Sequence, residues 1–162
     1  MQRIASYSVA LLWAAALPAT ALASDPVAFE WDLRLRHEHV EDDAFARDAD
    51  ATTARLRAGL RFDLGRGWTV LVEGEGIVDA GDRHNNGANG LTTRPAVIDP
   101  DGVELNQAWI GWKRDRFGAT LGRQRINLDN QRWVGAVAWR QNEQTFDALD
   151  LTLKPSEDWS LR

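Results

Sequence analysis

The sequence has no cysteine, no excess of basic residues and, beyond its first 23 residues, no long apolar run. Without cysteine there is no disulfide framework, no thiol nucleophile and no thiolate metal site. Against 19 lysine and arginine residues stand 24 aspartate and glutamate residues, and this net charge of -5 argues against a nucleic-acid partner. Because no stretch of about 18 apolar residues follows the amino terminus, a helical membrane protein is also excluded.

Residues 1–23 are predicted to be a cleaved signal peptide. Arg3 precedes the apolar stretch 4–17, and the small-x-small sequence of residues 21–23 forms a cleavage site before Ser24. A membrane-anchoring helix is the alternative, but the apolar stretch is shorter than the ~20 residues that a span requires. Cleavage would remove one positive charge, that of Arg3, and change the net charge from -5 to -6. We therefore expect an exported protein of one domain at most.

After the signal peptide, apolar and polar residues alternate with the two-residue period of a β-strand. The stretches 29–36 and 53–64 each place apolar residues on one face and charged residues on the other. Three further strands are expected over residues 68–79, 104–113 and 117–122, a sixth over 145–154, and a seventh from Trp159.

The first tight turn is predicted at Gly65-Arg66-Gly67. If Leu64 pairs with Trp68, Arg57 lies opposite Glu75, which is a stabilising pair of charges. Apolar residues then pair with apolar residues, namely Phe62 with Val70, Leu60 with Val72, and Ala54 with Val78. One register therefore satisfies both faces of the hairpin.

The connections between these strands alternate between long and short. The long ones are residues 40–51, 80–103 and 127–144, and the short ones are 65–67, 114–116 and 155–158. This alternation is typical of outer-membrane barrels, with short turns in the periplasm and long loops outside. Trp68, Phe117 and Trp159 each follow a short turn, as expected of a periplasmic aromatic girdle.

The predicted fold class is therefore all-β, an antiparallel transmembrane β-barrel of porin type, with apolar faces toward lipid and charged faces toward the lumen. About six to seven strands cannot close a barrel, whose smallest common form has about 8. We expect residues 24–162 to be the amino-terminal part of a longer outer-membrane barrel. A soluble periplasmic β-sandwich that binds carbohydrate is the alternative from a different class.

The charged faces predict a column of arginines along the lumen, formed by Arg34, Arg36, Arg55, Arg57 and Arg61. Such a column attracts anions and can pass a carboxylate or phosphate from one guanidinium to the next. The alternative is a set of cross-strand salt bridges without a net field. The register favours that alternative for Arg57 and Arg61, which have acidic neighbours in the third strand, more than for the other three.

Residues 127–144 are too apolar for a free loop, since they include Trp133 and Trp139. The segment either folds into the lumen, where Arg132 and Arg140 would stand at a constriction, or extends the barrel wall as a strand. In both cases the polar residues Asn130, Gln141, Asn142 and Gln144 are expected to hold the segment to the wall.

No metal site, cofactor or catalytic site is predicted. His37 and His39 share a strand face, but two ligands are too few for a metal and the pair fits an interfacial position better. The acidic residues around Asp99-Pro100-Asp101-Gly102 form a turn without the spacing of a calcium loop. Glu143 and Asp147 lie four positions apart, and no serine, histidine or lysine completes a catalytic group.

The later blocks of the sequence resemble those of the alginate-export outer-membrane porins. The matching blocks are Asp99-Pro100, Leu105-Asn106-Gln107-Ala108, Gly122-Arg123-Gln124, Leu128-Asp129-Asn130 and Trp139-Arg140-Gln141-Asn142-Glu143-Gln144. The resemblance implies a monomeric barrel of about eighteen strands with an electropositive lumen that passes an anionic polysaccharide. Glu73, Glu75 and Asp79 depart from this pattern, because they make part of the lumen acidic.

The expected function is an outer-membrane porin that passes anionic or polar solutes, with export of an alginate-like anionic polysaccharide implied by the resemblance. A general uptake porin for anions or small organic compounds is the alternative in the same membrane. The expected partners are outer-membrane lipid, the anionic polysaccharide or small anionic solutes, and periplasmic export machinery.

Overall fold

A computed structural model describes residues 26–81, 83–156 and 159–162. The predicted signal peptide, residues 1–23, lies outside these ranges. No helix among the described residues is long and apolar enough to cross a membrane.

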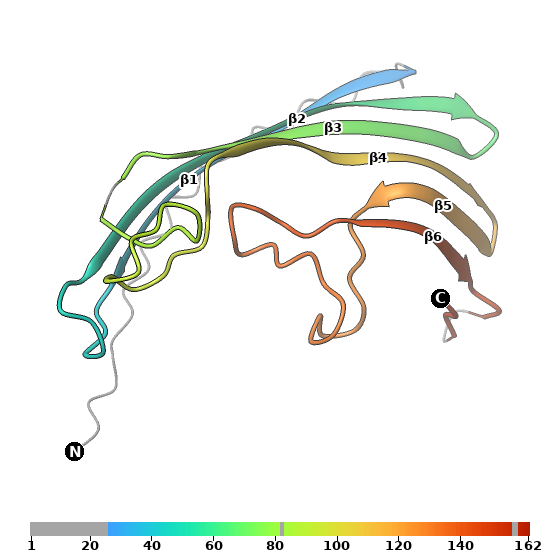
Figure 1. The fold of residues 1–162 in the computed structure, drawn as a ribbon. Helices are drawn as coiled ribbons and strands as arrows, with labels where there is room; N and C mark the ends of the chain where they lie inside the picture. The colour runs from blue at the N-terminus through green and yellow to red at the C-terminus, as the bar shows by residue number, and fades with distance from the viewer. Residues whose placement is uncertain (1–25, 82, 157–158) are drawn as a thin grey trace.

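Six strands form one antiparallel sheet in which each strand pairs with the next in sequence (Figure 1). They are β1 (Val27–Val40), β2 (Ala49–Gly65), β3 (Trp68–Asp79), β4 (Gly102–Arg114), β5 (Phe117–Gln124) and β6 (Phe146–Leu153). The predicted all-β antiparallel fold is confirmed. The described strands form an open sheet and do not close into a barrel, since β1 and β6 are not paired with each other. They also provide no second sheet, as the alternative sandwich would require.

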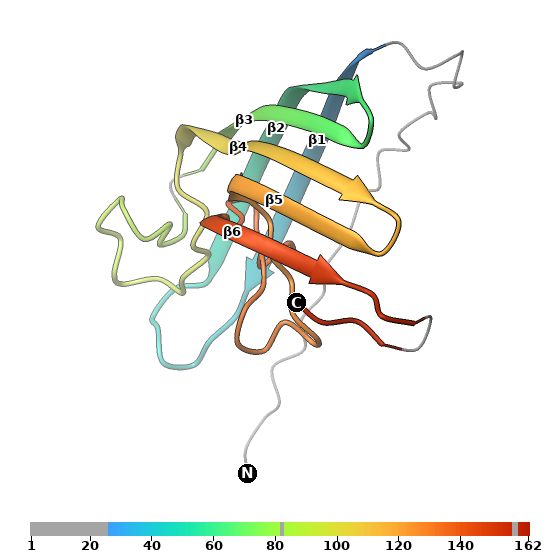
Figure 2. The ribbon, with the colours of Figure 1, turned by 90° about the vertical axis from the view of Figure 1, so that its right-hand side faces the viewer.

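The sheet is curved, and the long connections that follow β3 and β5 fold beneath its concave side (Figure 1). The two short turns lie at one end and the long connections leave from the other, so the predicted alternation is confirmed for β1 to β6 (Figure 2). The predicted seventh strand is not formed by the described residues after β6. Leu161 instead makes an isolated antiparallel bridge with Leu153.

The register between β2 and β3 matches the predicted one over most of its length. Arg57 lies opposite Glu75, and the three apolar pairs occur as expected. The prediction that Leu64 pairs with Trp68 is wrong, because Gly65 takes that place and Leu64 is left in a bulge. The turn residues have positive φ values, 54° at Arg66 and 87° at Gly67, as in the tightest hairpin turns.

A Gly67→Ala variant is expected to lose at least about 2 kcal/mol of unfolding free energy. A left-handed alanine costs about 1–2 kcal/mol by itself, and here its Cβ would stand 2.1 Å from the carbonyl oxygen of Lys113. Gly65→Ala is the matched control, because φ is 73° there but nothing lies within 4 Å of the added Cβ. Denaturant unfolding in lipid measures both. If both variants lost the same unfolding free energy, the contact of the added Cβ with Lys113 would have no cost.

A second bulge, at Asn106, changes which face the residues of β4 occupy. Glu73 lies opposite Gln107 and Gly74 lies opposite Leu105, so Asn106 has no partner across the ladder. Ile110 lies on the convex, apolar face. If β4 alternated strictly, Leu105, five positions earlier, would lie on the concave side. The bulge returns Leu105 to the apolar face and directs both Asn106 and Gln107 inward, where both are buried.

Burial in this sheet is the reverse of that in a water-soluble protein. Large apolar residues of the convex face are exposed, including Phe29, Trp31, Leu35, Leu56, Val78, Leu121 and Leu149. The concave side buries polar residues, including Thr53, Arg55, Arg57, Glu73, Glu75, Asn106 and Gln107. Only a few small or aliphatic residues, among them Leu71, Ile77 and Ala136, join them in the interior. The core therefore lies between the concave face and the connections folded beneath it.

Candidate functional site

The segment between β5 and β6, which includes residues 127–144, lies against the concave face of the sheet (Figure 1). It contains no strand. The interpretation in which Trp133 to Trp139 extends the wall as a strand is therefore wrong, and the segment lies on the side of the sheet that the inward-folded interpretation requires. The physical reason is a set of hydrogen bonds and ion pairs that join the segment to the strands.

Gln141 provides the first of these attachments, and none of its surface is exposed. Its side-chain amide donates to the hydroxyl of Thr53 on β2, at 2.9 Å. Its backbone amide donates to the carboxylate of Asp99, at 2.9 Å, and Asp99 in turn pairs with Arg36 at 2.7 Å. Gln141 thus joins the segment both to the sheet and to the connection between β3 and β4.

Arg34 provides a second attachment, because its guanidinium donates to three consecutive carbonyl groups of the segment. The distances are 3.0 Å to Ala138, 2.9 Å to Trp139 and 3.2 Å to Arg140. Arg34 makes no ion pair with a carboxylate among the described residues. Its charge is therefore shared with backbone dipoles and is not neutralised.

The third attachment is a charged cluster that we call the glutamate cluster, formed by Arg57, Glu73, Asn106, Arg125 and Glu143. Glu143 is buried and accepts from Asn106 at 2.8 Å, pairs with Arg57 at 3.0 Å, and also pairs with Arg125. Arg125 and Asn106 both reach Glu73, at 2.8 Å and 2.9 Å. Buried charges are stable only when paired in this way.

All five arginines predicted from the strands lie on the concave side, but most are paired with carboxylates. Arg55 pairs with Asp32, Arg57 with Glu75 and Glu143, and Arg61 with Glu30; Arg36 pairs with Glu38 and Asp99. The sequence predicted carboxylate partners for Arg57 and Arg61 more than for the other three arginines. That prediction is incomplete, because Arg36 and Arg55 are paired as well. The partners of Arg36 and Arg55 come from within β1 and from a distant connection.

The two arginines predicted from the segment differ in position. Arg140 is half-buried and donates to the carbonyl oxygen of Ile98 at 3.3 Å, with its guanidinium 4.8 Å from the centre of the Trp139 ring. Arg132 is exposed and stacks on Trp133, which is 90% exposed. Neither pairs with a carboxylate among the described residues.

Of the four polar residues expected to hold the segment, Gln141 is buried and attached to the sheet, whereas Asn130, Asn142 and Gln144 are exposed. Arg125 and Asn106 were not predicted to take part. Arg125 follows β5 directly and gave no signal beyond its charge. The signal for Asn106 is the apolar residue Leu105 at an odd position in β4, which requires a bulge.

The groups considered for metal binding and catalysis have separate partners. Glu143 is buried, whereas Asp147 is exposed and paired with Arg123 at 2.9 Å. Asp99 is buried against Gln141, away from any calcium-loop arrangement. His39 lies with Glu41 and Asp48 at an exposed strand end, where ligand atoms of the three approach within 4.8 Å of one another. His39 already hydrogen bonds to Asp50 there, at 2.7 Å.

No curated protein matches the chain at a significant level. The model of the family described as "Alginate export" matches residues 25–162, which is almost all of the chain after the predicted signal peptide. Members of this family are transport proteins of the outer membrane and not enzymes. The resemblance of the later sequence blocks and the match over the whole described sheet agree, and the chain belongs to the alginate export family.

Proposed function

We propose that the protein forms an outer-membrane pore for anionic solutes and exports an alginate-like anionic polysaccharide. The observation that carries this proposal is the reversed burial of the sheet, with apolar side chains exposed on the convex face and charged side chains buried on the concave face. Water would penalise this distribution, whereas lipid outside and a hydrated path inside would favour it.

The ends of the strands support a membrane position with the short turns in the periplasm. Trp68, Trp112 and Phe117 lie next to one another near the short turns, with ring centres 6.3 Å and 5.7 Å apart. Aromatic rings gather at this depth in membrane proteins because they are apolar bodies with polar edges. The exposed Phe29 and Trp31 lie toward the same end of β1, where β1 pairs with the last part of β2.

The inward-folded segment supports a path that selects anions. Residues 127–144 occupy the concave side, where they would narrow a pore. Arg34, Arg132 and Arg140 have no carboxylate partner among the described residues and would leave this narrow part positive. The glutamate cluster is held in buried pairs and fixes the segment. A positive constriction favours the entry of carboxylate groups over cations.

Reversal potentials across a salt gradient test this proposal, using the complete gene product in planar lipid bilayers. We expect a preference for chloride over potassium, and Arg34→Gln is expected to reduce the permeability ratio about two- to fivefold. A unit charge close to a hydrated path contributes about 1 kcal/mol or less, which sets this range. Arg66→Gln, in an exposed short turn, is the control and should leave the ratio unchanged.

Two outcomes would overturn the proposal. A cation preference in the wild-type protein would contradict an anion path. Release of the protein by osmotic shock without detergent would contradict membrane insertion. Anion preference without block by polymannuronate would favour the general uptake porin over the polysaccharide exporter.

A further inference from the structure

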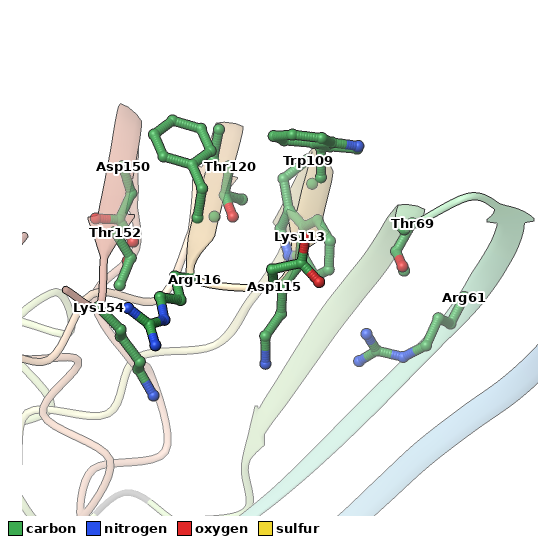
Figure 3. Close-up of a pocket in the computed structure, with 16 residues that line it drawn as sticks. Arg61, Thr69, Trp109, Lys113, Asp115, Arg116, Thr120, Asp150, Thr152 and Lys154 are labelled. Carbon is green, nitrogen blue, oxygen red and sulfur yellow. The ribbon is translucent and has the colours of Figure 1, made fainter. Parts of the chain in front are cut away.

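A hollow of about 360 Å³ lies on the sheet at its short-turn end, away from the inward-folded segment (Figure 3). Small and hydroxyl-bearing residues line its surface, namely Thr69, Gly111, Gly118, Thr120 and Thr152. Because these side chains are short, the hollow stays open between β3, β4, β5 and β6.

Cationic side chains from different elements surround the hollow. Lys113 comes from the end of β4, Arg116 from the turn before β5, and Lys154 from the residue after β6. Figure 3 shows their charged ends on the same side of the strands, with Arg61 of β2 facing them from across the hollow. Backbone bonds fix two of these positions, since the amide of Lys154 donates to the carbonyl of Arg116, at 2.8 Å.

The acidic residues that line the hollow do not cancel this charge. Asp150 is engaged by Arg162, at 2.8 Å, and Asp115 lies 3.9 Å from Arg114. Lys113 and Arg116 form no ion pair with any carboxylate in the part of the chain that the structure describes. The hollow therefore keeps a positive rim available to an anion.

An aromatic ring borders the same space. Trp109 extends from β4 toward the concave side, and its ring packs on Gly111, where an added Cβ would approach to 3.2 Å. The guanidinium of Arg61 lies 5.6 Å from the ring centre. An indole ring beside hydroxyl groups and cations offers both an apolar surface and charged donors to one ligand.

We propose that this hollow is a binding site for one acidic sugar residue of a polyanionic chain at the periplasmic mouth of the pore. The sugar carboxylate is held by Lys113 and Arg116, and the C–H face of the sugar ring packs on Trp109. This inference rests on the proposed pore function and adds to it the place where the polymer is first bound. Binding there aligns the chain before it meets the inward-folded segment.

Block of single-channel current by a mannuronate trisaccharide, added on the short-turn side, tests the proposal. Lys113→Gln and Trp109→Leu are each expected to raise the half-blocking concentration about fivefold, as the loss of one ion pair or one aromatic contact does. The controls are Arg66→Gln and Trp31→Leu. They remove a cation and an indole ring from exposed positions that do not line the hollow, and they should not change the block. Heat-modifiable migration on gels verifies that each variant is assembled.

The neutral mannose trisaccharide provides the comparison ligand and should block weakly in all variants. Equal block by mannuronate in wild type, Lys113→Gln and Trp109→Leu would overturn the site while leaving an anion-selective pore intact. Absence of block in a pore that prefers anions would overturn the site as well. Loss of anion preference in the wild-type protein would instead overturn the pore function on which the site depends.

Discussion

A Glu143→Gln variant is expected to detach residues 127–144 from the concave face. Glu143 is the one carboxylate of the segment in the glutamate cluster, and its replacement leaves Arg57 without one of its two partners and Arg125 paired only with Glu73. Removing one partner of a buried ion pair costs about 3–5 kcal/mol. The remaining attachments, at Gln141 and Arg34, are hydrogen bonds worth about 1 to 3 kcal/mol each. Most of the free-energy difference that favours the attached segment over the detached one should therefore be lost.

Limited trypsin digestion measures this detachment, because Arg140 lies inside the segment and is half-buried. Where proteolysis follows the population of an open state, cleavage after Arg140 should become at least about a hundredfold faster. Single-channel conductance should rise in the same variant, since the segment no longer narrows the path.

The matched control is Asp147→Asn, a substitution four positions from Glu143 that breaks an exposed ion pair with Arg123. An exposed pair contributes at most about 1 kcal/mol, so neither cleavage nor conductance should change appreciably. Unchanged cleavage in Glu143→Gln would contradict the assignment of Glu143 as an attachment of the segment.

A Leu56→Arg variant is expected to lose about 2–4 kcal/mol of unfolding free energy in a bilayer. Leu56 lies on the convex face near the middle of β2, paired with Leu33 and opposite Gly76, and half of its surface is exposed. Arginine at the midplane of a membrane barrel carries a cost of this size because its charge must leave water. In water the same substitution on an exposed surface would be nearly neutral.

Leu64→Arg supplies the comparison at a different depth. Leu64 is also exposed and apolar, but it lies in the bulge beside the short turn, where the cost should fall to about 0–1 kcal/mol. Guanidinium unfolding in lipid vesicles measures both variants. A cost below 1 kcal/mol at Leu56 would show that the convex face does not meet lipid.

The strands and their faces could be predicted because most of each strand alternates and because one register satisfies both faces of the first hairpin. Arg57 opposite Glu75 followed from the sequence for that reason. The bulges at Leu64 and Asn106 could not be predicted from alternation, because each inserts one residue that breaks the period. Leu105 marked the second bulge, as an apolar residue at a position that alternation assigns to the polar face.

The candidate site could be predicted only in part. The arginines were placed on the correct face, since position in a strand determines the face. Their partners were not predicted, because most of the attachments join residues far apart in the sequence. Gln141 reaches Thr53, and Asp99 receives both Arg36 and the amide of Gln141. A loop without a period gives no indication of which of its polar residues is buried.

The distance in sequence between Arg34 and its acceptors also bears on the order of folding. The neighbouring strands β2 and β3 are joined by a two-residue turn, whereas Arg34 and Trp139 are 105 positions apart. Contacts between neighbours close small loops at low entropic cost, and the docking of residues 127–144 must wait until β1 to β5 are assembled. The sheet therefore forms first, and the docking of residues 127–144 beneath its concave face is the last step of its folding.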